Sequence, residues 1–394
     1  MKKILMASAA IATCATVASA DDVKLGVLLG FTGPLESLAT PMALGAEMAI
    51  KEVSDSGKLL GGDTVTAVRG DSTCVDAAAA TAAAETLVTA DGVSGIVGAM
   101  CSGATSAVLQ NVGMPNGIVM ISPSATSPAL STVEDNGLFF RTAPSDARQG
   151  EVMADEILEK GITSVAVTYT NNDYGKGLAD SFATAYAAKG GTVTISAAHE
   201  DGKGDYSAEV GALASAGGDA LVVAGYVDQG GSGVLRGALD SGAFTTFVFP
   251  DGMVSQTLED NFGSELDGSF GQLPDSEGQG MDAYLAMATA AGYDGTSAYS
   301  GGSYDAAALI LLAMEAAGST DPKVYKDKIT EIANGPGEKI YPGELAKGLE
   351  LLKAGTAIDY DGATAVELIG AGEASGTFRE IEFKDGKITT VKYR

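Results

Sequence analysis

Short apolar runs alternate with longer helical patterns along most of the chain, and this alternation restricts the fold more than any other feature. Strand patterns are predicted at 23–29, 64–68, 95–100 and 117–122, with helices between them. The rhythm restarts after residue 144, with strands at 164–170, 193–197, 220–225 and 245–249. Alternating strands and helices form parallel sheets that are covered by helices on both faces. We therefore predict an α/β protein with two similar lobes.

Three further helices, predicted at 279–290, 304–317 and 322–333, follow the second half, although the first half has room for them. This order indicates that the chain crosses between the lobes more than once, and we place crossings near 142, 274 and 357. Lobe I then comprises 21–142 plus 275–356, and lobe II comprises 143–274 plus 357–394. The tail alternates like a hairpin around Asp385-Gly386.

Residues 1–20 have the pattern of a bacterial export signal. Lys2 and Lys3 precede an apolar run, and Ala18-Ser19-Ala20 fits the small-residue cleavage site. We expect cleavage after Ala20 and a soluble protein in the periplasm, because no later segment is long and apolar enough to span a bilayer. A lipoprotein signal that uses Cys14 is less favoured, because Thr13 is a poor residue before a lipid-modified cysteine.

Charge and missing motifs exclude several classes of function. The 51 acidic and 24 basic residues give a formal charge of −27, which disfavours nucleic acid and anionic lipid as partners. The first strand is not followed by a dinucleotide or P-loop glycine pattern. No G-x-S-x-G motif and no ligand spacing for a metal occurs either. We expect no cofactor, no metal and no catalytic residue.

Two cysteines remain once the signal is removed. Cys74 and Cys101 both follow predicted strands, so they should lie at one edge of a sheet. A pair of cysteines in an oxidising compartment is most simply a disulfide, worth roughly 3–4 kcal/mol for a loop of this length. The alternative is two unrelated buried thiols.

Small hydroxyl residues follow the third and fourth strands of the first half. Cys101-Ser102-Gly103-Ala104-Thr105 comes after one strand, and Ser122-Pro123-Ser124-Ala125-Thr126 after the next. Ligands of open α/β sheets bind at the carboxyl ends of strands, where free N–H groups and hydroxyls suit a carboxylate. Helix capping and a proline-led turn are the alternatives for each loop alone. Two such loops at one edge favour binding.

The second half has a carboxylate and tyrosines at the corresponding positions. Asp251, in Pro250-Asp251-Gly252, could bind a ligand ammonium, although this tripeptide is equally typical of a turn. Tyr174 and Tyr226 either line a pocket or pack at its rim. His199 is the only histidine, and we expect a satisfied surface residue rather than a base or metal ligand.

These loops resemble one known family along nearly the whole mature chain. The matching stretches, in order, are 27–34 with Gly45-Ala46-Glu47, the pair Cys74 and Cys101, Ile121-Ser-Pro-Ser-Ala-Thr-Ser-Pro128, Tyr169-Thr-Asn-Asn-Asp-Tyr-Gly-Lys-Gly177, Ile340-Tyr-Pro-Gly-Glu-Leu-Ala-Lys-Gly348 and Ile358-Asp-Tyr-Asp-Gly362. The sequence is similar to the periplasmic leucine/isoleucine/valine-binding proteins. The resemblance implies a two-lobed type I periplasmic binding fold with three crossovers.

The resemblance also implies roles for individual residues. Ser102 with Ser124, Ala125 and Thr126 would bind the ligand carboxylate, and Thr105 is a further candidate. Asp251 would bind the ammonium; the family has glutamate in this turn, so the chain departs from it by one methylene. Leu38, Tyr174, Tyr226 and Tyr299 would line the pocket, with Leu38 where some members have an aromatic residue.

We therefore predict a monomeric receptor of an ABC importer that closes on an amino acid, branched-chain or otherwise apolar, and docks on a membrane permease. One alternative is a related receptor for an amide, urea-like or small carboxylate solute, which would have little use for a buried Asp251. A sensory binding module is a second alternative. An enzyme is a third, but the chain offers no credible nucleophile and base.

Overall fold

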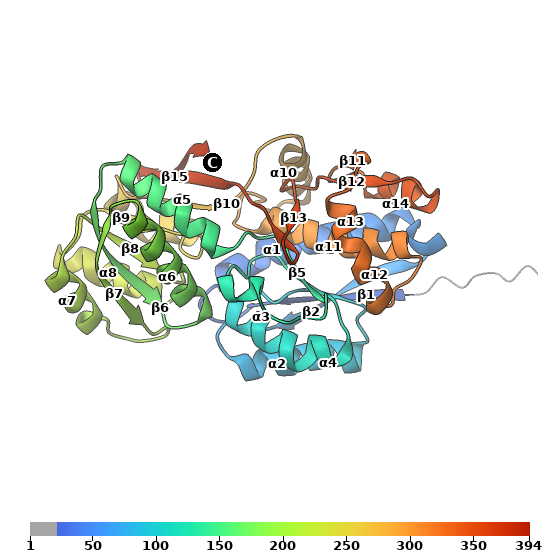
Figure 1. The fold of residues 1–394 in the computed structure, drawn as a ribbon, viewed down its shortest axis with the longest axis horizontal. Helices are drawn as coiled ribbons and strands as arrows, with labels where there is room; N and C mark the ends of the chain where they lie inside the picture. The colour runs from blue at the N-terminus through green and yellow to red at the C-terminus, as the bar shows by residue number, and fades with distance from the viewer. Residues whose placement is uncertain (1–21) are drawn as a thin grey trace, which may run out of the picture.

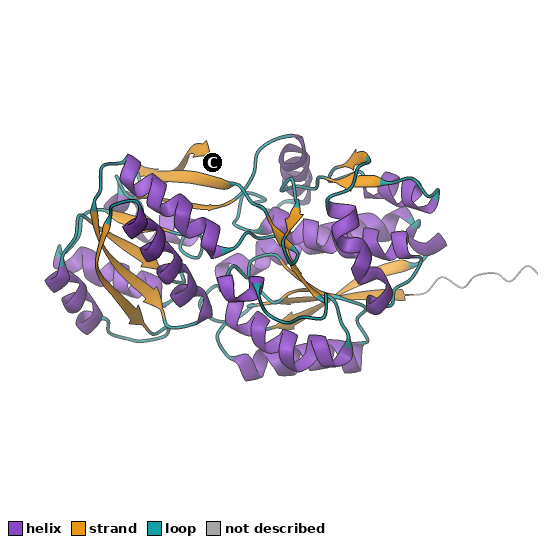
Figure 2. Cartoon of the chain, in the orientation of Figure 1, coloured by secondary structure: helices purple, strands orange, loops and turns teal. Residues whose placement is uncertain are grey.

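Two seven-stranded sheets, one in each lobe, organise the chain (Figures 1 and 2). The computed structural model describes residues 22–394, so the predicted export signal and its cleavage site lie outside the described residues. The strand orders are β2-β1-β3-β4-β5-β14-β13 and β7-β6-β8-β9-β10-β15-β16. The strands pair in parallel except for β13 with β14, β10 with β15, and β15 with β16. The predicted α/β architecture with two lobes is confirmed.

Lobe I contains the first sheet and the long buried helix α11. Its strands are β1 (Asp22–Leu29), β2 (Thr64–Asp71), β3 (Ile96–Gly98), β4 (Met120–Ser122), β5 (Phe139–Arg141), β13 (Leu368–Ile369) and β14 (Glu373–Ala374), with β11 (Glu338–Ile340) and β12 (Ile358–Tyr360) as a separate parallel pair. Its helices are α1 (Glu36–Ser56), α2 (Ala77–Thr86), α3 (Ser102–Val108), α4 (Met114–Asn116), α10 (Gln279–Ala291), α11 (Ser300–Ala317), α12 (Pro322–Tyr325), α13 (Ile329–Ala333) and α14 (Leu345–Lys353).

Lobe II contains the second sheet. Its strands are β6 (Ser164–Thr170), β7 (Thr192–His199), β8 (Ala220–Ala224), β9 (Phe247–Phe249), β10 (Phe270–Pro274), β15 (Phe378–Lys384) and β16 (Lys387–Tyr393). Its helices are α5 (Asp146–Glu159), α6 (Asp173–Ala188), α7 (Ser207–Ala216), α8 (Gly230–Ser241) and α9 (Gln256–Phe262). The predicted hairpin around Asp385-Gly386 is confirmed as β15 and β16.

Helix α11 belongs to lobe I, although it follows the strands of lobe II in the sequence. It is buried on all sides there. Every residue from Ser300 to Glu315 is buried, as expected for a helix without a polar face. It packs against α1, α13, α14 and β4. Gly45 of α1 allows the closest approach, because a Cβ at this position would lie 2.3 Å from the backbone oxygen of Ser300.

Helix α1 begins earlier than its sequence indicates. Thr40 followed by Pro41 predicts an N-cap at Thr40 and a proline in the first helical turn, but the helix begins at Glu36 and contains Pro41. The N–H of Ser37 donates to the Asp228 carboxylate of lobe II at 2.9 Å. The two residues are 191 positions apart in the sequence. When the N-terminus of a helix is capped by a residue of the other lobe, the sequence around that N-terminus contains no capping pattern.

The third crossing between lobes lies later than predicted. Residues 357–374 were expected in lobe II, but β12 pairs with β11, and β14 pairs with β5 of the first sheet. The chain therefore enters the second sheet only between Ala374 and Phe378. Strands of two or three residues show too little alternation to be recognised in sequence.

The predicted disulfide between Cys74 and Cys101 is present, with Cα atoms 5.1 Å apart. It joins the loop after β2 to the loop before α3. The bridge therefore fixes Ser102, the residue after the second cysteine, relative to the edge of the first sheet.

A buried acid in α5 generates a prediction about stability. Burial, with Glu380 nearby, raises the pKa of Glu156 to about 9, so the folded protein holds one more proton than the unfolded chain between about pH 4.5 and 9. Stability therefore falls as pH rises through this window. Glu156→Gln should raise the free energy of unfolding by at least about 1 kcal/mol at pH 8, with little effect near pH 4.5.

Urea unfolding at several pH values measures this effect, and Glu159→Gln is the matched control. Arg394 and Lys392 lower the pKa of Glu159 to about 2, so this carboxylate contributes stability that is present above about pH 4.5 and lost as pH falls toward 2. Its removal should destabilise the protein at neutral pH. Equal effects of both variants at pH 8 would contradict the assignment.

Candidate functional site between the lobes

Loops from both lobes enclose a small cavity. Its lining consists of Leu35, Leu38, Met100, Cys101, Ser102, Ser124, Tyr174, Tyr226, Asp251, Gly252 and Tyr299. Seven residues expected from the sequence therefore meet at one place: Leu38, Ser102, Ser124, Tyr174, Tyr226, Asp251 and Tyr299. Thr105, in α3, and Ala125 and Thr126, in the loop after β4, are close in sequence to these residues but do not line the cavity.

Asp251 provides the only charged side chain of this lining. It follows β9 in lobe II and is 3% exposed. Its Oδ1 accepts hydrogen bonds from Tyr174 Oη at 2.8 Å and from Gln149 Nε2 at 2.9 Å. Its Oδ2 accepts one from Tyr299 Oη of lobe I at 2.5 Å. The described residues thus give this carboxylate neutral donors and no cation.

Two tyrosines of lobe II form a flat aromatic wall beside Asp251. The rings of Tyr174 and Tyr226 stack with centroids 5.2 Å apart and an angle of 8° between their planes. Tyr174 Oη also accepts a hydrogen bond from the Gly252 N–H at 3.2 Å. Tyr174 therefore both lines the cavity and orients the loop that carries Asp251.

The hydroxyl loops of lobe I are tied to each other. Ser102 Oγ accepts from the Ser127 N–H at 3.1 Å, and Ser124 Oγ donates to the Met100 carbonyl at 2.8 Å. Thr105 Oγ1 donates to the Ala99 carbonyl at 3.1 Å, so it braces the loop behind the cavity. Thr126 Oγ1 is buried without a well-formed hydrogen bond among the described residues.

Arg141 supports these loops from behind, and the sequence analysis missed it. The side chain is 1% exposed and donates to the carbonyls of Ala125 and Ser127 at 2.8 and 3.0 Å. Its other end forms an ion pair with Glu373 and donates to Ser131. A single buried guanidinium therefore holds the loop beside the cavity and the strand next to the third crossing.

Asp146 is a second buried carboxyl group near Asp251 that the sequence analysis missed. It is the first residue of α5, and its N–H donates to the Thr126 carbonyl at 2.8 Å. Neither carboxyl oxygen has a well-formed hydrogen bond among the described residues. Burial raises the pKa of both acids; Asp251 raises that of Asp146 further, whereas the Thr126 hydroxyl and the Arg141 guanidinium act to lower it. Asp251, with three side-chain donors, is the better site for a negative charge.

Direct contacts hold the lobes together at the mouth of the cavity. The Asp228 N–H donates to the Pro34 carbonyl at 3.1 Å, and the Asp228 carboxylate accepts from the Ser37 N–H. Behind them, Tyr299 of lobe I reaches Asp251 of lobe II. The space that remains in the cavity measures only about 20 Å³. The cleft is therefore closed in this structure.

His199 lies away from the cavity, and its predicted surface position is wrong. The ring is 1% exposed, and Nδ1 lies 2.7 Å from Thr168 Oγ1. Burial lowers its pKa to about 4, so the imidazole is neutral at physiological pH. It follows the last apolar positions of β7, and the alternating burial of that strand turns it inward.

The position of Arg141 generates a prediction about the loop that it supports. Arg141→Gln should lower the free energy of unfolding by about 3 kcal/mol, because it breaks a buried ion pair and two hydrogen bonds to carbonyls. Hydrogen exchange of residues 124–131 should become faster. Arg148→Gln, at an exposed arginine in α5, is the control and should change stability by less than about 0.5 kcal/mol. Unchanged exchange in Arg141→Gln would contradict this role.

Comparison with known proteins identifies the class of the chain. Residues 22–334 match the model of a family described as periplasmic binding protein. The Leu/Ile/Val/Thr-binding protein of Salmonella typhimurium is 31% identical over 267 residues, covering 68% of this chain and 72% of that protein. A solved leucine binding protein from Thermotoga maritima has a TM-score of 0.79 at 21% identity, covering 94% of this chain and 98% of its own.

A branched-chain amino acid transporter substrate binding protein from Streptococcus pneumoniae, solved in complex with isoleucine, has a TM-score of 0.77 at 22% identity. The match covers 100% of that protein and 94% of this chain. No helix within 22–394 is long and apolar enough to cross a membrane. The chain belongs to the periplasmic binding protein family and is a substrate-binding receptor.

Proposed function

We propose that this receptor binds a free amino acid with an apolar, branched-chain side chain and delivers it to the permease of an ABC importer. One observation carries the proposal: the buried carboxylate of Asp251 in lobe II faces the hydroxyl loops of lobe I across a cavity that is otherwise apolar and aromatic. Such a cavity has opposite chemistry at its two ends, as a zwitterion requires.

The ammonium group binds at Asp251. A buried carboxylate without a cationic partner gains most from a ligand that brings one, because charge-assisted hydrogen bonds are about twice as strong as neutral ones. Tyr174 and Gln149 bond Oδ1 from within lobe II and leave Oδ2 directed toward lobe I. The ligand ammonium donates to this second oxygen.

The carboxylate group binds at the loops around Ser102 and Ser124. The amides of the first turn of α3 have no carbonyl partner within the helix, and the two hydroxyls lie beside them in the cavity lining. The side chain of the ligand packs against Leu35, Leu38 and Met100. These three side chains are buried and apolar, and they suit an aliphatic group.

The names of related proteins support the same ligand class. The Salmonella relative is described as binding leucine, isoleucine, valine and threonine, and the Streptococcus structure holds isoleucine. Export to the periplasm, cleavage after Ala20 and a monomeric state belong to the same proposal. Closure of the two lobes on the ligand then forms the surface that the permease recognises. No catalytic step is involved.

Asp251→Asn tests the ammonium site. The variant keeps the shape of the side chain and removes its charge, so we expect the Kd for leucine to rise by about 30-fold or more, with no loss of melting temperature. Isothermal titration calorimetry measures the affinity. Asp240→Asn, at an exposed acid of α8, is the matched control and should bind normally.

Ligand analogues separate this proposal from its alternatives. 4-Methylpentanoate lacks the ammonium and isopentylamine lacks the carboxylate, so both should bind far more weakly than leucine. If 4-methylpentanoate or an amide stabilises the protein against heat better than any amino acid, the receptor binds a different class of solute.

Binding should also depend on pH. Burial raises the pKa of Asp251, and the groups that face it are Asp146, Tyr174, Tyr299 and Gln149, none of them cationic. The unliganded site therefore takes up a proton as pH falls, and this proton must leave when an ammonium binds. We expect weaker leucine binding at pH 5 than at pH 8, with proton release detected by calorimetry in buffers of different ionisation enthalpy. Affinity that is independent of pH over this range would contradict the assignment.

A further inference from the structure

Tyr299 lies where the ligand of the proposed function should lie. It precedes α11 in lobe I, and its hydroxyl donates to Asp251 Oδ2 of lobe II. The other two side-chain donors to Asp251, Tyr174 and Gln149, come from lobe II itself. Tyr299 is thus the donor that reaches this carboxylate across the cleft, as the ligand ammonium must.

The remaining space is too small for an amino acid. The cavity measures about 20 Å³, whereas a cavity that admits benzene measures about 150 Å³. A branched aliphatic side chain with its ammonium and carboxylate needs at least as much room as benzene. At least one side chain of the lining must therefore move before such a ligand fits.

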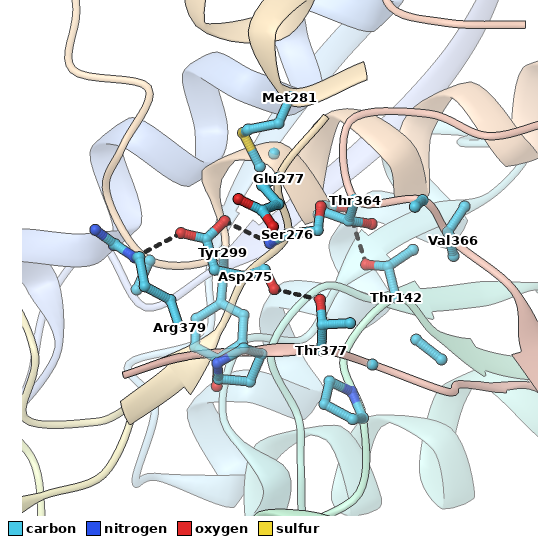
Figure 3. A pocket seen from close by; sticks show the side chains of 18 of the residues that line it. Thr142, Asp275, Ser276, Glu277, Met281, Tyr299, Thr364, Val366, Thr377 and Arg379 are labelled. Atoms are coloured by element: carbon cyan, nitrogen blue, oxygen red, sulfur yellow. Dashed lines mark hydrogen bonds and ion pairs between the residues drawn. The ribbon is translucent and has the colours of Figure 1, made fainter. Parts of the chain in front are cut away.

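Tyr299 also lines a second cavity, which we call the hinge-side cavity. It measures about 350 Å³ and borders all three segments that connect the lobes, at Thr142, Asp275 and Thr377 (Figure 3). Tyr299 lines both cavities. The larger one has more than enough room for a phenol ring, by the same comparison with benzene.

Ser300, the residue after Tyr299, is held in place by hydrogen bonds of its side chain. Ser300 Oγ donates to the Pro41 carbonyl at 2.9 Å, and Tyr284 Oη contacts the same hydroxyl. Tyr299 itself has a φ of 63°, in the left-handed region that a tyrosine rarely adopts. Its side chain is only partly buried. We therefore expect the ring to move by rotation about its side-chain bonds rather than by movement of the backbone.

We propose that Tyr299 is an internal plug that occupies the ammonium site in the unliganded closed state and withdraws into the hinge-side cavity when an amino acid binds. This inference rests on the proposed function. The hydroxyl and the ligand compete for Asp251, so the plug lowers the apparent affinity. The ring can withdraw only if the hinge-side cavity has room for it. Because the connecting segments line this cavity, ligand entry is coupled to their bending when the lobes move.

Two matched tyrosine variants test the competition. Tyr299→Phe removes the donor that crosses the cleft, and we expect leucine to bind about 3- to 30-fold more tightly. Tyr174→Phe removes the donor from within lobe II that orients Asp251, and binding should weaken. Calorimetry measures both. If Tyr299→Phe binds leucine no better than wild type, the hydroxyl is a ligand contact or an unused bond, and the inference is overturned.

A cavity-filling variant tests the withdrawal. Met281 lines the hinge-side cavity and does not line the cleft cavity, so Met281→Trp reduces the space for the ring without touching the ligand. We expect at least about a fivefold loss of affinity in the wild-type background and none in a Tyr299→Ala background. Equal losses in both backgrounds, or none in either, would overturn the inference. Melting temperatures verify that each variant is folded.

A measurement without ligand distinguishes this inference from the proposed function. Loss of a contact between the lobes should enlarge the radius of gyration of unliganded Tyr299→Phe in small-angle scattering, while Tyr174→Phe should match wild type. If wild type binds no amino acid, the proposed function fails and the plug fails with it. If wild type binds leucine and Tyr299→Phe is neither tighter nor more open, only the plug is wrong.

Discussion

A buried carboxylate without a cationic partner is the constraint on which the interlobe site depends. Asp251 is removed from water and is bonded only by neutral donors, from Tyr174, Gln149 and Tyr299. Burial of a charge without a counter-ion is unfavourable, and the raised pKa of Asp251 expresses this imbalance. A receptor can use such a site, because the missing cation is what a ligand supplies. The proposed specificity for an ammonium follows from this cost of burying the carboxylate.

Hydrogen bonds and ion pairs link the loops around Asp251 to the segments that connect the two lobes. Arg141 joins the loop beside the cavity to Glu373, next to the third crossing, and Asp228 caps α1 across the mouth of the cleft. The buried helix α11 holds the backbone after Tyr299 against α1. The residues proposed to contact the ligand are therefore held in place by contacts with other elements of the fold. Movement is left to the three connecting segments and to side chains such as Tyr299.

The fold could be predicted from the sequence because its information is local. Long strands such as β6, and helices with clear starts such as α2, whose cap Asp76 bonds two N–H groups, follow from apolar periodicity and capping. The predictions failed where the determinant was distant in sequence. The cap of α1 comes from Asp228, and the short strand β14 is defined by its pairing with β5.

The site was predictable to a similar degree. Ser102, Ser124, Tyr174 and Asp251 were predicted because each follows a strand at a sheet edge, and the structure brings all four into the lining of one cavity. Arg141, Asp146 and Gln149 were not, because their importance comes from burial and from partners on other elements. A buried arginine or acid has no sequence pattern of its own. The signal that could have pointed to them is their place at the end of β5 and the start of α5, where the chain first passes from lobe I to lobe II.

The most direct test of the account is a crystal structure of the protein with leucine bound. We predict the ligand nitrogen about 2.7–2.9 Å from Asp251 Oδ2, the distance of a charge-assisted hydrogen bond, with the ring of Tyr299 in the hinge-side cavity. A structure in which Tyr299 still bonds Asp251, while the ligand ammonium is bound elsewhere, would contradict it.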